Sequence, residues 1–495
     1  NNLCDDEFHF KQWLISPYMP TPTIIEAAQA LYRGHGVKEI SRSSAGAYNL
    51  SLTTKVLNRI IEQSKQYHQK SICFVTGVPG AGKTLVGLNI ANERHQYDKQ
   101  EHAVFLSGNG PLVAVLREAL VRDEIKRCKG KITKITSKRK VAAFIQNIHH
   151  FRDTYLPPSE QVPAEKVTIF DEAQRAWTKE QTAKFMLKRH VPSWNMSEPE
   201  FLISVMDRHQ DWAVIICLIG GGQEIHTGEA GLLAWFDALR NHFPHWNVYV
   251  SPQISDVEYT QGKPLESLFM GLHLYQEKKL HLSVSLRSFR NEKVSAFVKS
   301  LLDENLPIAQ QLYSELSLNY PIVITRSLEK AKQWVQNQSR GTERYGLISS
   351  SGAKRLRQFG IWVQNDIQAE NWFLNDKEDV RSSYFLEETA TEFDIQGLEI
   401  DWAIVAWDAD FRIEKGHFKA YNFKGSSWKI VRKKDAQLYL KNTYRVLLTR
   451  ARQGFVIFIP KGCDEDLTRH SSFYDGIYYY LKEIGIKELC LSEEQ

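Results

Sequence analysis

Several features that define other classes of protein are scarce or missing in this sequence. It has six cysteines among 495 residues and no Cys-x-x-Cys pair, which argues against a zinc ribbon or a disulfide framework and is typical of a reducing compartment. No apolar run approaches the roughly 20 residues that cross a bilayer, and no apolar signal segment follows Asn1. We therefore expect a cytoplasmic protein without a membrane partner.

A large excess of one charge is also lacking. The chain has 63 Lys and Arg residues and 58 Asp and Glu residues, giving a formal net charge of +5. This value is compatible with a polyanionic partner but is weak evidence for one. Between Arg122 and Lys140, however, nine of 19 residues are Lys or Arg, and the local net charge is +7. Such a run can follow a phosphate backbone, and a solvated loop is an equally good interpretation.

The order of the apolar runs predicts two α/β domains, and 495 residues are too many for one compact core. From Ser71 onward, short β-rich runs alternate with amphipathic helical stretches. This alternation is typical of parallel sheets with helices on both faces. Strands are expected at 72–76, 103–106, 167–171, 213–219 and 248–250, and then at 322–325, 346–349, 402–407 and 454–459.

An N-terminal extension precedes these runs. We expect helices near Asp6–Leu14 and Thr23–Tyr32, and a further helix over Leu52–Gln66. The polar stretch 251–279 indicates an insertion or linker. The predicted boundaries are 1–49 for the extension, 50–285 for the first domain and 286–495 for the second, with a charged, aromatic insertion near 410–435.

Residues 77–84 form a complete G-x-x-x-x-G-K-T motif, Gly-Val-Pro-Gly-Ala-Gly-Lys-Thr. The motif follows an apolar strand and opens a helix over Leu85–Glu93, which is the context of a phosphate-binding loop. Glycines allow backbone N–H groups to turn onto phosphate oxygens. We expect Lys83 to bridge the β- and γ-phosphates of ATP and Thr84 to ligate Mg²⁺. The glycines expected to cradle the phosphates are Gly77, Gly80 and Gly82.

Two adjacent carboxylates, Asp171 and Glu172, end the predicted strand at 167–171. In an open parallel sheet, ligands bind at the carboxyl ends of the strands. Asp171 can hold the hydrated Mg²⁺, and Glu172 can orient or deprotonate the attacking water. A helix N-cap is the other common use of such a pair, but the phosphate-binding loop upstream favours catalysis. The sequence therefore predicts an ATP hydrolase.

Asp-Glu-Ala-Gln at 171–174 resembles the Walker B motif of superfamily 1 helicases, and further segments resemble that family's motifs in the family's order. The segments that resemble motifs Ia, III, IV, V and VI are 105–113, 218–224, 285–288, 392–399 and 444–452. The family usually has an acid before the Gln of motif III, whereas Gly222 precedes Gln223 here. The resemblance covers about residues 71–460 and is strongest to bacterial helicase-like proteins related to the helicase portion of Schlafens.

The resemblance implies an ATP-dependent translocase or helicase with two RecA-like parallel-sheet domains in tandem, preceded by a short helical extension. It implies that Gln223 senses the γ-phosphate and that Gln174 links the nucleotide to nucleic acid. Motif V would add Gly397 and Glu399 to the nucleotide site. Arg287 and Arg450 would act as arginine fingers at the domain junction. An arginine supplied by a second domain makes hydrolysis depend on domain closure.

Single-stranded nucleic acid is the expected partner, and we favour DNA over RNA although no feature of the sequence reads the 2′-OH. The strand would cross the tops of both domains, held by backbone contacts and aromatic stacking. The expected contacts are Asn109, the loop near His149–Phe151 and Trp177 in the first domain, and Trp407, Trp428 and the basic stretch 424–434 in the second. The sequence does not indicate an oligomeric state.

Two other functions fit parts of the sequence. One is an ATPase switch, gated by nucleic acid or protein, that controls a partner such as a nuclease or a defence-system component without unwinding. Gly222 and the divergent outer segments keep this alternative open. Some relatives carry a nuclease-like domain ahead of this region, and nothing in residues 1–49 resembles one. The other function, a P-loop kinase, leaves the motif around Arg450 and the second predicted sheet unexplained.

Overall fold

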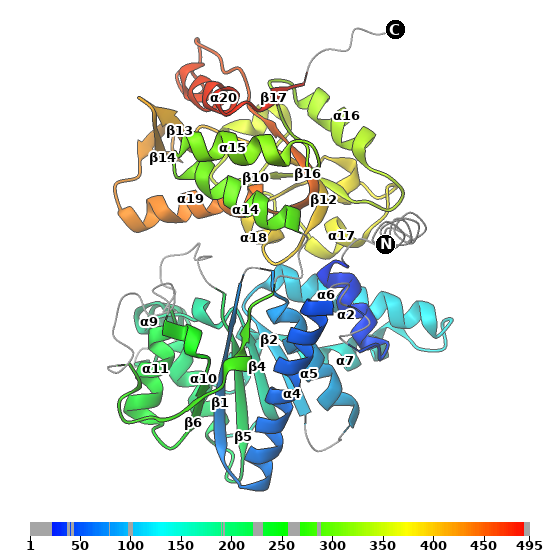
Figure 1. The fold of residues 1–495 in the computed structure, drawn as a ribbon, viewed down its shortest axis with the longest axis vertical. Coiled ribbons are helices and arrows are strands. Elements are labelled where there is room, and N and C mark those ends of the chain that lie inside the picture. The colour runs from blue at the N-terminus through cyan, green and yellow to red at the C-terminus, as the bar shows by residue number, and fades with distance from the viewer. Residues whose placement is uncertain are drawn as a thin grey trace, which may run out of the picture.

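The structure is a computed structural model that describes residues 22–36, 40, 44–78, 80–97, 102–189, 191, 194–220, 231–255, 268–284 and 289–489. Two α/β units lie one above the other, with the N-terminal unit below in Figure 1. Within these described ranges, no helix combines the length and the apolar character that crossing a lipid bilayer requires.

An eight-stranded parallel sheet forms the centre of the first unit. The strands lie in the order β3-β2-β4-β5-β1-β6-β7, and β8 pairs with the end of β1. Their bounds are β1 Lys70–Gly77, β2 His102–Ser107, β3 Ile145–Asn147, β4 Glu165–Asp171, β5 Ala213–Leu218, β6 Asn247–Val250, β7 His273–Gln276 and β8 His281–Leu282. Because all pairs are parallel, the carboxyl ends share one edge, and that edge faces the second unit (Figure 1).

Helices cover both faces of this sheet, as the alternating side chains of β1 require. Cys73 and Val75 belong to the apolar cluster beneath α4–α7, whereas Ile72 and Phe74 belong to the cluster beneath α8–α11. The helices of the first face are α4 Ser44–Gln66, α5 Lys83–Tyr97, α6 Gly110–Arg127 and α7 Lys134–Phe144. Those of the second face are α8 Ile148–Thr154, α9 Lys179–Lys188, α10 Glu198–Met206 and α11 Gly231–His242. Helix α2, Ile24–Tyr32, packs against α5 and α6.

The second unit has a six-stranded parallel sheet in the order β11-β10-β12-β16-β9-β17. Its strands are β9 Ile322–Thr325, β10 Tyr345–Ser349, β11 Thr389–Ala390, β12 Ile400–Ala406, β16 Ala451–Phe458 and β17 Lys487–Glu488. The helices are α14 Phe289–Leu302, α15 Leu306–Leu316, α16 Leu328–Gln338, α17 Ala369–Leu374, α18 Glu392–Ile395, α19 Lys434–Leu448 and α20 Ser472–Ile484. The two sheets confirm the predicted fold class, α/β with two RecA-like units in tandem.

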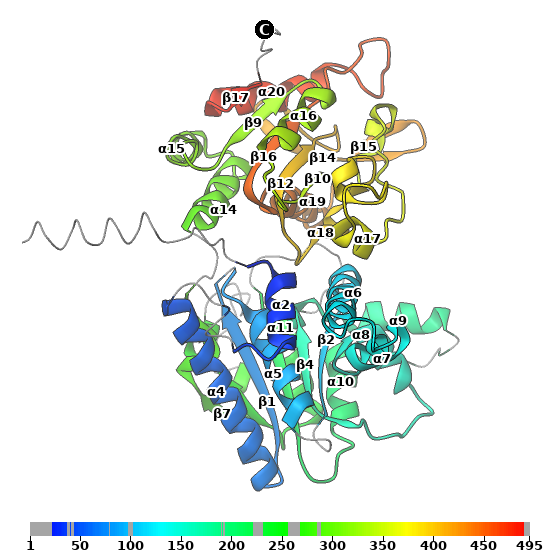
Figure 2. The same cartoon turned by 90° about the vertical axis from the view of Figure 1, so that its right-hand side faces the viewer.

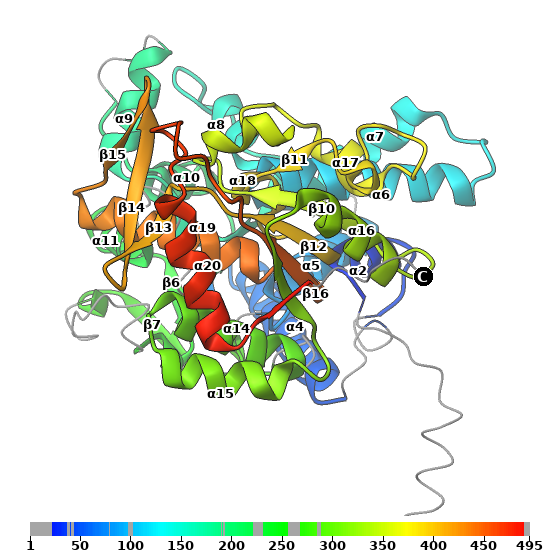
Figure 3. The same ribbon diagram turned by 90° about the horizontal axis from the view of Figure 1, so that it is seen from above.

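A small antiparallel sheet lies beside the second unit, on the side away from α16 (Figure 3). It consists of β13 Phe411–Glu414, β14 His417–Lys424 and β15 Ser427–Ile430. These strands fall in the segment for which a charged, aromatic insertion was expected. The predicted domain boundaries themselves stay predictions, and the one at 285 lies outside the described residues.

All nine predicted strands are present, with ends that differ by at most three residues. The helix predicted at Thr23–Tyr32 is confirmed as α2, with Thr23 as its N-cap. The helix predicted to begin at Leu52 begins at Ser44 instead. The interpretation of 251–279 as an insertion or linker is wrong for part of this stretch, because β7 extends the sheet by pairing with β6. The helix predicted at Asp6–Leu14 lies outside the described residues.

The two units contact each other through α6, which packs against α17 and α18 (Figure 2). A single cluster of buried apolar residues extends from the first unit into the second. At the end of α6, the Arg122 guanidinium donates to the Leu374 carbonyl at 3.0 Å and to Asn375 Oδ1 at 2.8 Å. The interface therefore combines apolar packing with hydrogen bonds, which gives the two sheets a defined relative position.

Arg122 belongs to the basic run 122–140, which forms the end of α6, the following turn and α7. Other cations of this run pair with acids on α6, and the pairs are Arg127–Asp123 at 3.1 Å, Lys134–Glu118 at 2.9 Å and Lys140–Glu124 at 3.1 Å. In each pair a largely exposed cation meets a carboxylate that is buried or nearly so. These pairs and the Arg122 contacts show that part of the positive charge stabilises the helical hairpin and the contact between the units. Neither interpretation of the run included this use.

Candidate nucleotide site and nucleic-acid interface

The G-x-x-x-x-G-K-T loop connects β1 to α5 at the carboxyl edge of the first sheet. Gly80 and Gly82 have φ angles of +76° and +87°, a left-handed conformation that L side chains avoid. A Cβ atom on Gly77 would lie 2.7 Å from the Leu282 carbonyl oxygen, and Val78 N donates to the same oxygen at 3.1 Å. The glycines are therefore needed for the backbone path of the loop and for the close approach of β8.

Lys83 is the first residue of α5, and its ammonium group lies over the loop that precedes it. Its Nζ donates to the Gly77 carbonyl at 2.8 Å and to the Val78 carbonyl at 3.3 Å. Phosphate oxygens accept stronger, charge-assisted hydrogen bonds than neutral carbonyls do. A bound polyphosphate would therefore compete with these two carbonyls for the Lys83 ammonium group.

Thr84 and Asp171 meet across β5, the strand between β1 and β4. Thr84 Oγ1 donates to Asp171 Oδ1 at 3.2 Å. Burial, and then the negative charge of Glu172, raises the pKa of Asp171 to about 7, against the opposing effects of the Thr84 hydrogen bond and the Lys83 charge. A buried carboxylate beside a hydroxyl fits Mg²⁺, which prefers oxygen ligands and favours the ionised carboxyl. Thr84 and Asp171 are thus the residues that would hold the metal ion.

Glu172 lies in a strained turn directly after β4. Its φ angle is +51°, which costs about 1–2 kcal/mol for a residue other than glycine. Its Oε2 accepts a hydrogen bond from Gln174 Nε2 at 2.5 Å, and the buried Gln174 accepts one from Gly220 N at 3.0 Å. A Cβ on Gly220 would lie 2.8 Å from Glu172 Oε2. The turn after β4 and the end of β5 therefore fix the position of the Glu172 carboxylate.

Two predicted site residues, Gln223 and Arg287, lie outside the described residues, and their roles stay predictions. The described chain before Gln223 ends at Gly220, the residue that binds Gln174. The described chain before Arg287 contains β8, which pairs with Thr76 and Gly77 beside the phosphate-binding loop.

Arg450 lies between α19 and β16 in the second unit. Its side chain is 5% exposed, and its Nε donates to the Val446 carbonyl at 3.2 Å. Helix α19 runs along the side of the second unit that faces the first (Figure 1). The hydrogen bond to Val446 is made within the second unit. The action of Arg450 on a γ-phosphate bound to the first unit therefore stays a prediction.

Gly397 of motif V lies against the start of α6. Gly397 has a φ angle of +77°, and a Cβ on it would lie 3.2 Å from Asn109 Nδ2 and 3.3 Å from Leu112 Cδ2. Glu399 is half-buried, and its charge contributes, after burial, to the raised pKa of Tyr320. The structure therefore brings Gly397 to the predicted nucleic-acid side of the first unit, next to motif Ia.

Two residues that the sequence analysis did not select, Arg175 and Gln396, join the units at this point. Arg175 Nη1 donates to Gln396 Oε1 at 2.6 Å, and Asn109 Nδ2 donates to the Gln396 carbonyl at 2.6 Å. We call these two contacts the Gln396 bridge. The only sequence signal was position, because Arg175 follows Gln174 and Gln396 precedes Gly397. The bridge connects the turn that carries Glu172 to the second unit.

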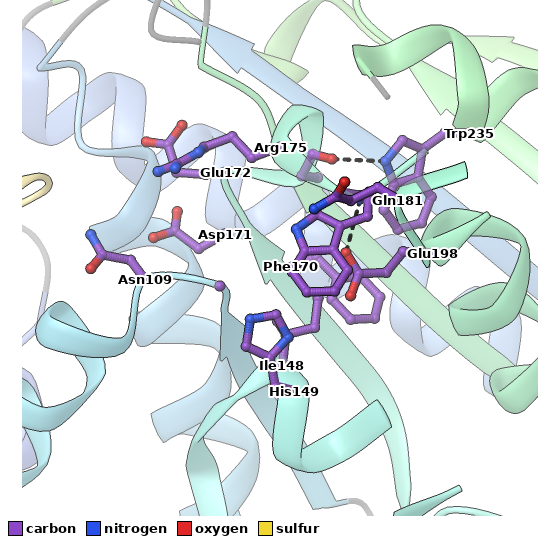
Figure 4. Close-up of a pocket in the computed structure, with 14 residues that line it drawn as sticks. Asn109, Ile148, His149, Phe170, Asp171, Glu172, Arg175, Gln181, Glu198 and Trp235 are labelled. Carbon is purple, nitrogen blue, oxygen red and sulfur yellow. Dashed lines mark hydrogen bonds between the residues drawn. The ribbon is translucent and has the colours of Figure 1, made fainter. Parts of the chain in front are cut away.

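A cavity of about 210 Å³ lies beside the Gln396 bridge, at the carboxyl ends of β2, β3 and β4. Figure 4 shows Asn109, Asp171 and Glu172 together at one side of the cavity and Trp235 and Glu198 at the other. The remaining lining residues are Gly108, Ile148, His149, Phe170, Ala173, Arg175, Ala176, Trp177 and Gln181. Of the first-unit contacts expected for nucleic acid, Asn109, His149 and Trp177 thus line one cavity.

One aromatic residue expected to contact nucleic acid in the second unit was wrongly selected. Trp407 is fully buried; its Nε1 donates to the Phe411 carbonyl at 2.6 Å, and its ring centroid lies 4.2 Å from that of Tyr444. It therefore cannot stack on a base. Trp428 is half-buried, and its Nε1 donates to the Thr468 carbonyl at 2.8 Å.

The model of one protein family, described as Schlafen group 3, DNA/RNA helicase domain, matches residues 70–461. A search of curated proteins finds no match.

Among solved structures, the chain is similar to three helicases at low identity. DUF1998 helicase MrfA bound to DNA is 10% identical, with a TM-score of 0.32 over 94% of this chain and 54% of that chain. The Hef helicase domain of Pyrococcus furiosus is 13% identical, with a TM-score of 0.27 over 85% and 97%. Dbp5 of S. cerevisiae, bound to RNA and ADP BeF3, is 11% identical, with a TM-score of 0.30 over 90% and 93%. The chain thus spans about half the length of MrfA.

Proposed function

Since the chain belongs to the Schlafen group 3 DNA/RNA helicase domain family, we propose that it is a superfamily 1 type translocase that hydrolyses ATP while moving along single-stranded nucleic acid. A helicase domain uses ATP and acts on DNA or RNA. The observation that carries the finer proposal is the turn after β4. This turn holds Glu172 at the candidate nucleotide site. Three residues later in the same turn, Arg175 donates a hydrogen bond to Gln396 of the second unit.

In this proposal, the phosphate-binding loop and the Lys83 ammonium bind the β- and γ-phosphates of ATP. Thr84 and Asp171 hold Mg²⁺, which neutralises charge on the phosphates. Glu172 orients the attacking water and accepts its proton. Gln174 keeps the Glu172 carboxylate in place through the 2.5 Å hydrogen bond. Each of these roles uses a side chain that the fold already brings to the edge between β1 and β4.

Movement would arise because one turn, the one after β4, contacts both the candidate nucleotide site and the second unit. A shift of Glu172 on loss of the γ-phosphate would also shift Arg175, which donates to Gln396 at 2.6 Å. Asn109, the N-cap of α6 at the predicted nucleic-acid side, binds the same residue. The two units and the two ligands would then form one linked equilibrium, in which each bound state favours one domain separation.

The alternative is an ATPase switch that changes domain position without unwinding and controls a partner such as a nuclease or a defence-system component. It is favoured by Gly222, which stands where the helicase family has an acid in motif III. The Gln396 bridge would serve such a switch equally well, because it transmits nucleotide state without requiring net movement along a strand.

Steady-state ATP hydrolysis by the purified chain distinguishes the two functions. It should be measured alone and with single-stranded DNA, single-stranded RNA or duplex, at two salt concentrations. For the translocase we expect strong stimulation by one kind of single strand, and the stimulation should fade with salt because phosphate contacts release counterions. A directional strand-displacement assay on that nucleic acid follows. A rate of ATP hydrolysis that no nucleic acid changes would favour the switch gated by a protein.

A further inference from the structure

The small antiparallel sheet of the second unit carries a dense group of positive charges. Between Glu414 and Asp435, seven residues are Lys or Arg and none is acidic. In Figures 1 and 2, this sheet lies on the same side of the molecule as α9 of the first unit. Five of the seven cations lie between the end of β14 and the start of α19, and we call them the basic ribbon: Lys424, Lys429, Arg432, Lys433 and Lys434.

The cations of the basic ribbon have no acidic partner in the described part of the chain. All five are exposed, and their side chains make no ion pair or hydrogen bond with a described residue. The other basic run, 122–140, differs in this respect, because Arg127, Lys134 and Lys140 pair with acids on α6. The positive charge of the ribbon therefore stays available to an anionic partner outside the chain.

The aromatic side chains of the same hairpin are held by the second unit. Trp428 Nε1 donates to the Thr468 carbonyl at 2.8 Å, and the Trp428 ring packs edge-on against Phe423 at 5.1 Å. The Arg412 guanidinium lies 3.7 Å from the ring centroid of Tyr421. None of the described Phe, Tyr and Trp side chains of β13–β15 is exposed. The ribbon therefore offers charge to a ligand but no open ring on which a base could stack.

Strand pairing places two of the lysines on one face of the hairpin. Asn422 lies opposite Lys429, and Lys424 lies opposite Ser427. Side chains two residues apart on a strand share a face, so Lys424, Lys429 and the exposed Asn422 point to the same side. Because the paired backbone already fixes their spacing, a ligand that binds both lysines does not have to order the backbone first.

We propose that the basic ribbon binds the phosphate backbone of double-stranded nucleic acid, at a place separate from the single-strand track. A duplex carries one negative charge per about 1.7 Å of its axis, whereas one of its strands alone carries one per about 3.4 Å. Sites for single strands usually add aromatic stacking to charge, and the ribbon lacks it. The inference rests on the proposed function, since the duplex would adjoin the single strand on which the protein moves.

A duplex on the ribbon would lie at the start of the helix that leads to Arg450. Lys433 is the N-cap of α19, and its side chain makes no capping hydrogen bond. Positive charge at the N-terminus of a helix is unfavourable, so phosphates bound there would stabilise this end of α19. The helix ends at Leu448, two residues before Arg450. The ribbon would thus link duplex binding to the part of the second unit that is proposed to act on ATP.

The test compares duplexes with a single strand. Fluorescein-labelled duplex DNA and duplex RNA of about 20 base pairs, roughly two helical turns, and a single DNA strand of the same length are titrated with the full chain. Fluorescence anisotropy gives the affinity at several salt concentrations. For Lys424→Gln combined with Lys429→Gln, the slope of log K against log salt should fall in magnitude by about 2 for a duplex, or about 1 for each lost phosphate contact.

At about 0.1 M salt, these two substitutions should weaken duplex binding at least about tenfold and change single-strand binding less than about twofold. Lys55→Gln combined with Lys278→Gln is the matched control. It removes the same charge from exposed positions on α4 and on the short 3-10 helix 278–280. Figure 2 shows α4 on the side of the molecule opposite β15. Thermal unfolding verifies that both double variants fold.

The wild type and the single strand keep the test decisive. A selective loss with either duplex supports the inference and identifies the nucleic acid that the ribbon binds. Equal weakening of duplex and single strand, or unchanged duplex binding, would overturn it. A wild type that binds no duplex, but whose ATP turnover a single strand stimulates, would overturn this inference alone. A wild type that binds no strand, and whose turnover no strand changes, would overturn the proposed translocase as well.

Discussion

Substitution of Lys83 tests the assignment of the phosphate-binding loop most directly. Its ammonium is the only side-chain charge that the phosphate-binding motif itself supplies to the β- and γ-phosphates. Lys83→Ala should reduce ATP turnover by about 10²–10³-fold, a loss like that of one preorganised donor at a developing charge. Turnover is measured by phosphate release, and Lys55→Ala, an exposed lysine on α4, is the control. Near-normal turnover would refute the assignment of the nucleotide site.

Glu172→Gln separates binding from chemistry at the same site. The carboxamide can still accept the hydrogen bond from Gln174 Nε2, but it cannot take a proton from water. ATP binding, measured by equilibrium titration, should therefore persist while hydrolysis stops. A variant that no longer binds ATP would show that Glu172 supports the structure of the site instead. Glu160→Gln, at an exposed position, serves as the comparison.

Asp410 allows a prediction about pH. It is fully buried and accepts hydrogen bonds from Ser350 Oγ at 2.6 Å and Tyr444 Oη at 2.5 Å. Burial, and then the charge of Asp408, raises its pKa to about 7, compared with about 3.9 in an unfolded chain. The native state therefore holds the proton more tightly, and its advantage is lost as pH rises from about 4 to about 7.

Asp410→Asn removes this titration, because asparagine stays neutral. Between pH 5 and pH 8, the free energy of unfolding of the wild type should fall more than that of the variant, by on the order of 2 kcal/mol. Urea unfolding at the two pH values measures this difference. Other titrating groups, including Asp171, are common to both proteins and largely cancel. Parallel changes in the two proteins would contradict a raised pKa at Asp410.

The short connection between α18 and β12 is the element that brings motif V to the first unit. Gly397→Ala places a Cβ in the left-handed region, which costs about 1–2 kcal/mol, and presses it against Asn109 and Leu112. We expect lower thermal stability and a several-fold smaller stimulation of ATP turnover by nucleic acid. Gly416→Ala has a similar φ of +81° but no described atom within 4 Å of the added Cβ, so it should lose stability without losing stimulation.

Elements differ in how far the sequence predicts them. The nine predicted strands are largely buried on both faces, so their continuous apolar runs identify them. The strands that were missed, among them β7 and β8, are short or exposed. In β7, three of four residues are exposed, and it is a strand because β6 offers an unpaired edge. Pairing at a sheet edge depends on the neighbouring strand, which a local pattern does not contain.

At the scale of the whole molecule, substitutions of Arg450 test whether ATP turnover depends on closure of the two units. An arginine finger is worth about 10³–10⁵ in rate in comparable enzymes. Arg450→Ala should therefore slow ATP turnover far more than it weakens ATP affinity, and Arg450→Lys, which keeps a charge in a nearly buried position, should recover part of the rate. Stopped turnover with normal thermal unfolding would support the role, and an effect confined to affinity would contradict it. Arg340→Ala, at an exposed position, is the control.

The sequence by itself determined which residues make up the candidate nucleotide site. Its glycines, lysine and threonine fall within eight consecutive residues, and the acid pair directly follows a strand, so the backbone arranges each of these two groups locally. Only the tertiary structure decided how the two units meet. Arg175 and Asn109 bind Gln396 across 221 and 287 residues, Trp407 is buried in the core, and His149 and Trp177 share one cavity wall. These contacts follow from the packing of α6 against α17 and α18 and from the order of β2, β3 and β4, and no spacing along the chain specifies them.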